Sequence, residues 1–132
     1  MSEKPQSKML PVAVDAIAPD GSHVRILCGT SRGSMAHFEL GAGEISRPVK
    51  HRTVEEIWFI LSGVGIMWRQ AEGSDPQETD LRPGVSLTIP TGTAFQFRNT
   101  GRVPLEAIGV TMPPWPGPDE AEEAEGAWEP NI

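Results

Sequence analysis

Very few side chains in this sequence are suited to binding a metal or to moving a proton near neutral pH. The 132 residues include three histidines, His23, His37 and His51, and a single cysteine, Cys28. Imidazole is the commonest metal ligand and acid-base group in proteins, and a thiolate binds soft metals. His23 lies in the turn-like DGSH and is expected to face solvent, whereas the alternation in SMAHFEL leaves the direction of His37 open. Cys28 has no CxxC partner and is expected to fill the core.

Charge is distributed unevenly along the chain. The formal net charge of -7 disfavours nucleic acid and anionic membrane as partners. Residues 113–132 hold six acidic side chains and no Lys or Arg, so this tail accounts for nearly all of the net charge. We expect the tail to be largely solvated. Because an exposed indole is unfavourable, we also expect Trp115 or Trp128 to dock on the body or on a second subunit.

The length of the chain is that of one compact domain. We predict an N-terminal arm (residues 1–10), a single β-barrel domain (11–112) and the acidic tail (113–132). A composition of 38% hydrophobic and 22% charged residues suits a soluble core, and the longest apolar run is too short to span a bilayer. The N-terminus lacks the pattern of a secretory signal, and a lone cysteine forms no internal disulfide. These features predict a cytoplasmic protein.

Glycines and prolines divide the chain into short segments with a preference for β-structure. Strands are predicted over residues 12–17, 23–28, 34–40, 56–61, 65–70, 85–89, 94–98 and 105–111. Several of them alternate with a period of two, which is typical of a strand with one buried face. Helical spacing is not sustained anywhere, apart from a short turn within residues 119–126. The pattern predicts an all-β fold, either a sandwich or a barrel.

Two spaced motifs decide between these architectures. The first has the spacing G-x5-V-x-H-x4-E-x6-G and consists of Gly43, Val49, His51, Glu56 and Gly63. The second has the spacing G-x5-P-x-G-x2-F-x3-N and consists of Gly84, Pro90, Gly92, Phe95 and Asn99. With substitutions at individual positions, these are the two motifs of the cupin superfamily, which the chain resembles. The resemblance implies a double-stranded β-helix, or jelly-roll barrel, of eight or more strands, with segment 56–61 paired centrally and residues 1–10 peripheral.

The resemblance also implies where a metal would bind. Cupins with an intact site hold a divalent metal with three His and one Glu or Gln, and the matching positions here are Val49, His51, Glu56 and Phe95. Only His51 and Glu56 can coordinate, whereas a catalytic metal usually has about three protein ligands. We therefore expect no tightly bound cofactor and at most weak binding of a divalent metal. A further ligand would have to come from elsewhere, and the candidates are His23, Cys28, His37 and Gln96.

The same alternation predicts the contents of the barrel. If Glu56 faces inward, Trp58 faces inward with it, and Phe95 and Phe97 are expected to join them from another strand. The result is an aromatic cavity with a polar pair at its mouth, which is typical of a small-molecule site. The alternative is that the rings fill a narrow barrel. The candidate ligand-binding residues are Trp58, Phe95, Phe97 and His37.

Two classes of function remain open, and neither identifies a substrate. In the first, the chain is a small-molecule-binding module with a degenerate metal site. In the second, it is an enzyme in which His51 and Glu56 act as an acid-base pair in a metal-independent isomerase or epimerase. A metal-dependent oxygenase or isomerase is less favoured because ligands are missing. Since cupins commonly pair through their sheets and the strand over residues 12–17 needs a sheet edge to join, we also expect a homodimer.

Overall fold

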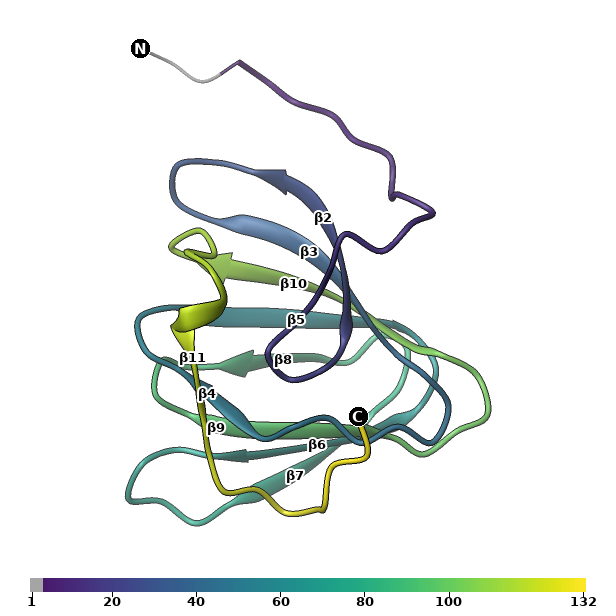
Figure 1. The fold of residues 1–132 in the computed structure, drawn as a ribbon, viewed down its shortest axis with the longest axis vertical. Helices are drawn as coiled ribbons and strands as arrows, with labels where there is room; N and C mark the ends of the chain where they lie inside the picture. Colours follow the sequence, from purple (N-terminus) through teal and green to yellow (C-terminus); the bar gives the residue numbers. More distant parts are fainter. Residues whose placement is uncertain (1–3) are drawn as a thin grey trace.

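The computed structural model describes residues 4–132, which form eleven β-strands and one short 3-10 helix (Figure 1). The elements in chain order are β1 (Ala16–Ile17), β2 (His23–Gly29), β3 (Ser34–Leu40), β4 (Val49–His51), β5 (Glu55–Ser62), β6 (Gly65–Gln70), β7 (Gln77–Leu81), β8 (Ser86–Ile89), β9 (Ala94–Asn99), β10 (Leu105–Met112), η1 (Pro118–Glu120) and β11 (Ala121–Glu123). Within this part of the chain, no helix is long and apolar enough to cross a membrane.

The strands form two antiparallel sheets. One has six strands in the order β1-β2-β3-β10-β5-β8, and the other has five in the order β11-β4-β9-β6-β7. Strands distant in sequence lie side by side, as β3 and β10 do, because most of the connections after β3 cross from one sheet to the other. Figure 1 shows the resulting stack of strands, with the barrel closed on one side by the C-terminal segment. This arrangement confirms the predicted all-β jelly-roll barrel.

The buried side chains of the core come from every second residue of a strand. On β5, Glu56, Trp58 and Ile60 are buried, while the residues between them are exposed. β5 pairs with β10 on one side and β8 on the other, so it is an inner strand, as predicted, although it lies next to the edge strand β8. The buried apolar cluster draws on both sheets and consists of Leu40, Val49, Trp58, Ile60, Met67, Leu81, Leu87, Ile89, Phe95, Phe97, Leu105 and Ala107.

Two glycines are required by close approaches inside the barrel. A Cβ atom on Gly109 would lie 2.5 Å from Cε2 of Phe38 and 3.2 Å from Cδ1 of Trp58, so only glycine leaves room for this pair of rings. Gly63 has a φ of +81° in the turn between β5 and β6, where a Cβ atom would lie 2.5 Å from the carbonyl oxygen of Pro104. The first glycine shapes the interior, and the second permits the turn.

The structure corrects the predicted strands at a few places. The first strand covers only Ala16–Ile17 rather than residues 12–17, since the carbonyl of Val12 accepts hydrogen bonds from the side chain of Arg25 instead of a strand neighbour. Strands β4, β7 and β11 were not expected from the sequence. Their signal is weak because β4 and β11 have three residues each and β7, with the sequence QETDL, is almost entirely polar.

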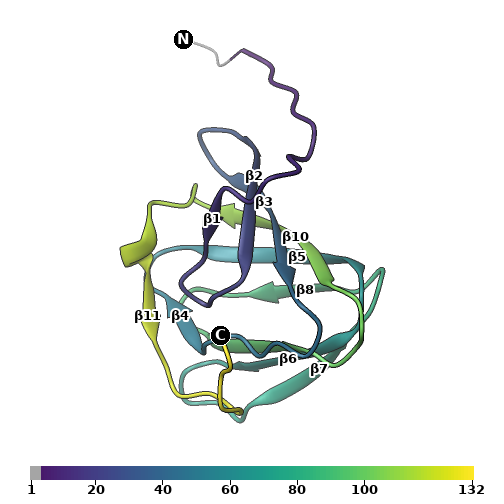
Figure 2. The same ribbon diagram turned by 45° about the vertical axis from the view of Figure 1, so that its right-hand side comes forward.

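The two ends of the described chain behave differently. The segment before β1 extends away from the barrel, whereas the C-terminal end lies against it (Figure 2). Met9 and Val12 in the extended segment are 87% and 95% exposed.

Candidate functional site

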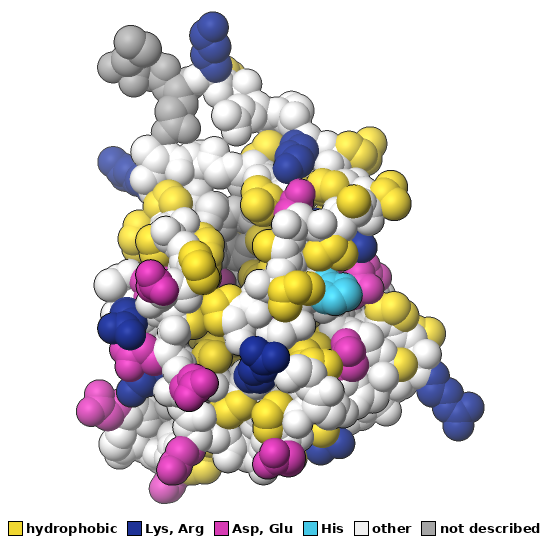
Figure 3. Space-filling view, in the orientation of Figure 1, with side chains coloured by type: hydrophobic (Ala, Val, Ile, Leu, Met, Phe, Trp, Pro, Cys, Tyr) yellow, Lys and Arg dark blue, Asp and Glu magenta, His cyan; other side chains and the backbone are white. Residues whose placement is uncertain are grey.

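A cavity of about 380 Å³ opens between the six-stranded sheet, strand β4 and the segment around η1. Figure 3 shows a hollow on this face of the molecule, bordered mainly by hydrophobic side chains. The cavity is lined by Ala16, Ile17, Ala18, Pro19, Asp20, Val24, Ile26, Ser34, Met35, Ala36, Phe38, Val49, His51, Glu56, Trp58, Phe95, Thr111, Trp115, Pro118 and Ala121. Its size is within the range of small-molecule sites, about 300–1,000 Å³.

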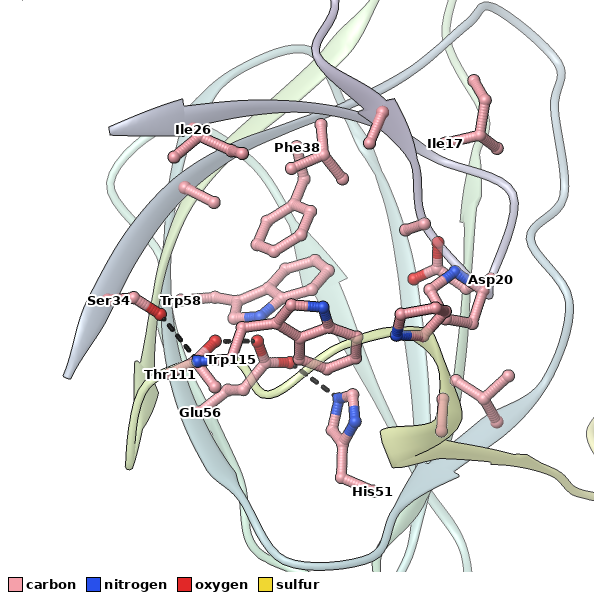
Figure 4. A pocket seen from close by; sticks show the side chains of 18 of the residues that line it. Ile17, Asp20, Ile26, Ser34, Phe38, His51, Glu56, Trp58, Thr111 and Trp115 are labelled. Carbon is pink, nitrogen blue, oxygen red and sulfur yellow. Dashed lines mark hydrogen bonds and ion pairs between the residues drawn. The ribbon is translucent and has the colours of Figure 1, made fainter. Parts of the chain in front are cut away.

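A hydrogen-bonded chain of three side chains lies at the polar end of the cavity (Figure 4). The Nε2 atom of His51 is 3.0 Å from Oε1 of Glu56, and the hydroxyl of Thr111 donates to Oε2 of Glu56 at 2.6 Å. All three residues are buried. Both oxygens of Glu56 are therefore engaged, while Nδ1 of His51 has no hydrogen-bond partner within the described chain.

Aromatic rings form the walls of the cavity. Phe38 and Trp58 are stacked, with centroids 4.9 Å apart and an angle of 13° between their planes. Phe95 meets the rings of His51 and Trp58 at 5.3 Å and 6.3 Å. Trp115, which is 37% exposed, lies edge-on to His51 at 5.4 Å and is held by a hydrogen bond from its backbone N–H to the hydroxyl of Ser34. The predicted aromatic cavity is thus present, with Trp115 as an additional wall.

Asp20 is a pocket residue that sequence reasoning missed. It belongs to the turn between β1 and β2, is only 5% exposed, and directs its carboxyl group toward the cavity (Figure 4). Its Oδ1 atom accepts hydrogen bonds from the backbone N–H and the hydroxyl of Ser22, at 2.9 Å and 2.6 Å. Burial raises the pKa of Asp20 above its ordinary value, and the nearby carboxylate of Glu56 raises it further. In the sequence, DGS resembles any solvent-exposed turn, and no signal shows that this turn folds over the barrel mouth.

Two of the predicted ligand-binding residues lie outside the cavity. Phe97 is on the inner face of β9 but packs deeper in the core, edge-on to Trp58 at 5.1 Å. His37 points away from the cavity because Phe38, its neighbour on β3, points into it. His37 instead pairs with Glu106 at 2.9 Å on the other face of the sheet.

The pair of His37 and Glu106 belongs to a separate polar cluster. The hydroxyl of Ser62 donates to Glu106, and this bond, together with the contact to His37, holds the pKa of Glu106 below its ordinary value. This cluster has no connection to the cavity, so His37 is not available as a ligand or base there.

The side chains at the barrel mouth do not fit a tightly bound divalent metal. Val49, His51, Glu56 and Phe95 all line the cavity, as the motif positions imply, but two of the four have no donor atom. Within residues 4–132, no group of three or more His, Cys, Asp or Glu is arranged to hold a metal. Gln96 lies on the opposite face of β9, where its amide is hydrogen-bonded to Ser46 and Trp128.

The C-terminal segment builds one side of the site. Strand β11 pairs with β4, which places Ala121 opposite His51. Just before β11, Glu120 accepts hydrogen bonds from Thr53 and from the backbone N–H of Arg52. Burial opposes ionisation of Glu120, but these hydrogen bonds outweigh it and lower its pKa. Trp128 lies beside the guanidinium group of Arg98 at 5.3 Å.

The raised pKa of Asp20 predicts a specific dependence of stability on pH. Between the ordinary value of 3.8 and its higher value in the folded state, the folded protein binds more protons than the unfolded chain. Asp20 therefore lowers stability as pH rises through this interval, and the loss persists at higher pH. Asp20→Asn keeps an oxygen for Ser22 and removes the charge, so the variant should be more stable than the wild type at neutral pH, with the difference shrinking toward about pH 4. Urea unfolding across this range measures the effect, and a difference independent of pH would contradict it.

The fold and the remnant ligand set define a class of protein, a double-stranded β-helix with a pocket at the barrel mouth. The model of the cupin domain family matches residues 36–111. An uncharacterized protein of Methanocaldococcus jannaschii is 30% identical over 117 residues, which cover 82% of this chain and 90% of that protein. The chain belongs to the cupin family.

Solved structures share the fold at low sequence identity. The capsular polysaccharide assembling protein CapF of Staphylococcus aureus superposes with a TM-score of 0.73 and 18% identity, over 91% of this chain and 33% of CapF. This chain thus spans about a third of CapF. An uncharacterized protein of Klebsiella pneumoniae with a double-stranded β-helix domain gives a TM-score of 0.63 and 18% identity, over 80% of this chain and 85% of that protein.

Proposed function

We propose that this cupin is a small-molecule-binding protein whose ligand occupies the cavity beneath Trp115. The observation that carries the proposal is a concave site with mostly apolar walls and a few convergent polar groups, namely His51, Glu56, Thr111 and Asp20. A barrel completely filled by its own rings, the alternative considered above, would leave no such volume. An apolar or aromatic group of the ligand would lie against Phe38 and Trp58.

Binding is favoured over acid-base catalysis by the hydrogen bonds of the polar pair. A general base needs a free atom within reach of the proton that it takes. Both oxygens of Glu56 accept hydrogen bonds, and Nε2 of His51 is engaged with Glu56. The remaining ring nitrogen, Nδ1 of His51, is buried and has no hydrogen-bond partner within the described chain. Catalysis by this pair would require His51 to turn.

A cavity-filling variant tests the proposed function. Ala36 lies on β3 and lines the cavity, so Ala36→Trp should occupy the space of the ligand. In a screen of small organic molecules by thermal shift, compounds that stabilise the wild type should have no effect on Ala36→Trp. Ala71→Trp, at an exposed position between β6 and β7, is the matched control and should respond as the wild type does. Equal responses of all three proteins would show that binding occurs elsewhere and would contradict the proposal.

We also propose that two copies associate through the outer face of the six-stranded sheet. Ile57, Phe59 and Leu61 alternate with the buried residues of β5 and are 47%, 47% and 44% exposed. Adjacent exposed apolar side chains on a strand that is paired on both sides favour an interface. A second copy is the occupant that we infer, because each copy would contribute both this face and an exposed apolar arm that includes Met9 and Val12.

The dimer is tested by sedimentation of the wild type and two variants. The wild type is expected to sediment as a dimer at tens of micromolar, on the order of ordinary weak-dimer dissociation constants. Phe59→Ser should dissociate it, whereas Val103→Ser, at an exposed apolar position outside β5, should not. A monomeric wild type would overturn the proposal.

A further inference from the structure

We propose that the ligand of this cavity is an organic cation, an ammonium compound that carries an apolar or aromatic group. This inference rests on the proposed function and specifies its ligand. It follows from the signs of the charges around the cavity, the placement of Asp20 and the aromatic walls.

Apart from His51, the ionisable side chains that line the cavity are acidic. Asp20 and Glu56 are among the lining residues, and within residues 4–132 the lining includes no Lys or Arg. His51 is the one group that could carry a positive charge, and it is paired with Glu56. When both carboxyl groups are ionised, the sum of these charges is negative whether or not His51 is protonated. A carboxylate or phosphate ligand would meet two buried carboxyl groups, and the one side chain that could offer it a positive charge, His51, is already paired with Glu56.

Asp20 has one carboxylate oxygen that is available to pair with a cation. Both hydrogen bonds from Ser22 go to Oδ1 of Asp20, and no hydrogen bond to Oδ2 occurs within the described chain. The two oxygens of Glu56, in contrast, are both engaged. Asp20 is 5% exposed and points into the cavity, so an ammonium group beside it would form a buried, charge-assisted hydrogen bond. The same charge is unfavourable in the empty site, where burial raises the pKa of the carboxyl group.

The walls suit the rest of such a ligand. Trp58, Phe38, Phe95 and Trp115 surround the cavity, and aromatic faces attract cations as well as apolar groups. The apolar end, formed by β1 to β3, includes Ile17, Val24 and Ile26 and would take an alkyl or aryl group. Trp115 at the mouth would shield the ion pair from water.

Three probes that differ only in their polar end test the charge preference. Phenethylamine is a cation at neutral pH, 2-phenylethanol is neutral and 3-phenylpropionate is an anion. Binding is measured by calorimetry and by quenching of tryptophan fluorescence at low salt. We expect phenethylamine to bind at least about tenfold more tightly than 2-phenylethanol, a preference that corresponds to one buried charge-assisted contact. We expect 3-phenylpropionate to bind most weakly.

Variants assign the preference to Asp20. Asp20→Asn keeps an acceptor for both Ser22 donors and should lower the affinity for phenethylamine much more than the affinity for 2-phenylethanol, so that most of the preference for the cation is lost. Asp75→Asn, at an exposed position between β6 and β7, is the matched control and should behave as the wild type. Thermal unfolding of each variant confirms that it is folded.

The outcomes separate the ligand class from the function itself. Equal affinity for the cation and the alcohol, or tighter binding of 3-phenylpropionate, would overturn the cation proposal and leave the pocket as a binding site. A preference for the cation that survives Asp20→Asn would also overturn it, because the charge would then act elsewhere. If none of the probes binds and the thermal-shift screen also yields no ligand that Ala36→Trp blocks, the proposed function itself fails.

Discussion

The double variant Val49→His with Phe95→His should bind zinc or manganese orders of magnitude more tightly than the wild type. Val49 and Phe95 occupy the two motif positions where cupins with an intact site have histidine, and all four positions line the same cavity. Val49 and Phe95 are direct partners in the pairing of β4 with β9, so the new imidazoles would lie side by side. His51 lies next to Phe95, with ring centroids 5.3 Å apart.

The two substitutions should lower the stability of the metal-free protein, and metal binding should raise it again. Each imidazole supplies a nitrogen at about 2.0–2.1 Å from zinc in typical sites. Replacing a buried phenyl ring with an imidazole that fits less well costs about 1–3 kcal/mol in the absence of metal. Metal at about a hundred times its dissociation constant should restore about 2.7 kcal/mol of stability.

Calorimetry with zinc and manganese on the wild type and the variants decides this prediction. The single variants Val49→His and Phe95→His should show intermediate affinities, and removing His51 from the double variant should reverse the gain. A wild type that already holds one metal tightly in each chain would contradict the prediction, because it would require a ligand outside the four motif positions.

Trp58→Ala should destabilise the protein by about 3–5 kcal/mol, the range for removing a large buried aromatic side chain. Trp58 is 1% exposed, stacks on Phe38 and meets Phe97 edge-on at 5.1 Å. Its loss would leave a void between the two sheets and would also remove one wall of the proposed binding site. Urea unfolding measures the change in the free energy of unfolding.

Trp115→Ala is the matched control for this prediction. Trp115 lines the same cavity but is 37% exposed and rests at the mouth, so its removal should cost much less stability than removal of Trp58. It should nevertheless weaken binding of a ligand, because Trp115 covers the pocket. If both variants lost the same stability, Trp58 would not be the centre of the core that its contacts indicate.

Much of the barrel and part of the site follow from local patterns in the sequence. Strands β3 and β6 have the predicted bounds, because short β-prone runs between turns specify where strands begin and end. The period of two on β5 places Glu56 and Trp58 on one face, since neighbouring side chains on a strand point in opposite directions. The motif spacing indicates that Val49, His51, Glu56 and Phe95 meet, and all four line the cavity.

The tertiary structure alone decided which other residues reach the pocket. Asp20 lies in a turn, and the direction of a turn side chain depends on how the loop packs across the barrel rather than on any repeat in the sequence. The sequence left the direction of His37 open, because an isolated strand pattern does not say which of its two faces is turned inward. In the structure, His37 lies on the face away from the cavity and pairs with Glu106.

The C-terminal segment also shows the difference between what local sequence predicts and what the tertiary structure decides. Its six acidic residues predicted a largely solvated tail in which one tryptophan docks on the body. In the structure both tryptophans contact the body, Trp115 at the cavity and Trp128 beside Arg98, and β11 extends the sheet beside β4. Gln96, although it alternates with two buried rings, is itself buried by this segment. Local sequence determines the period of each strand, whereas the face that is turned inward and the contacts between distant segments depend on the closed barrel that brings them together.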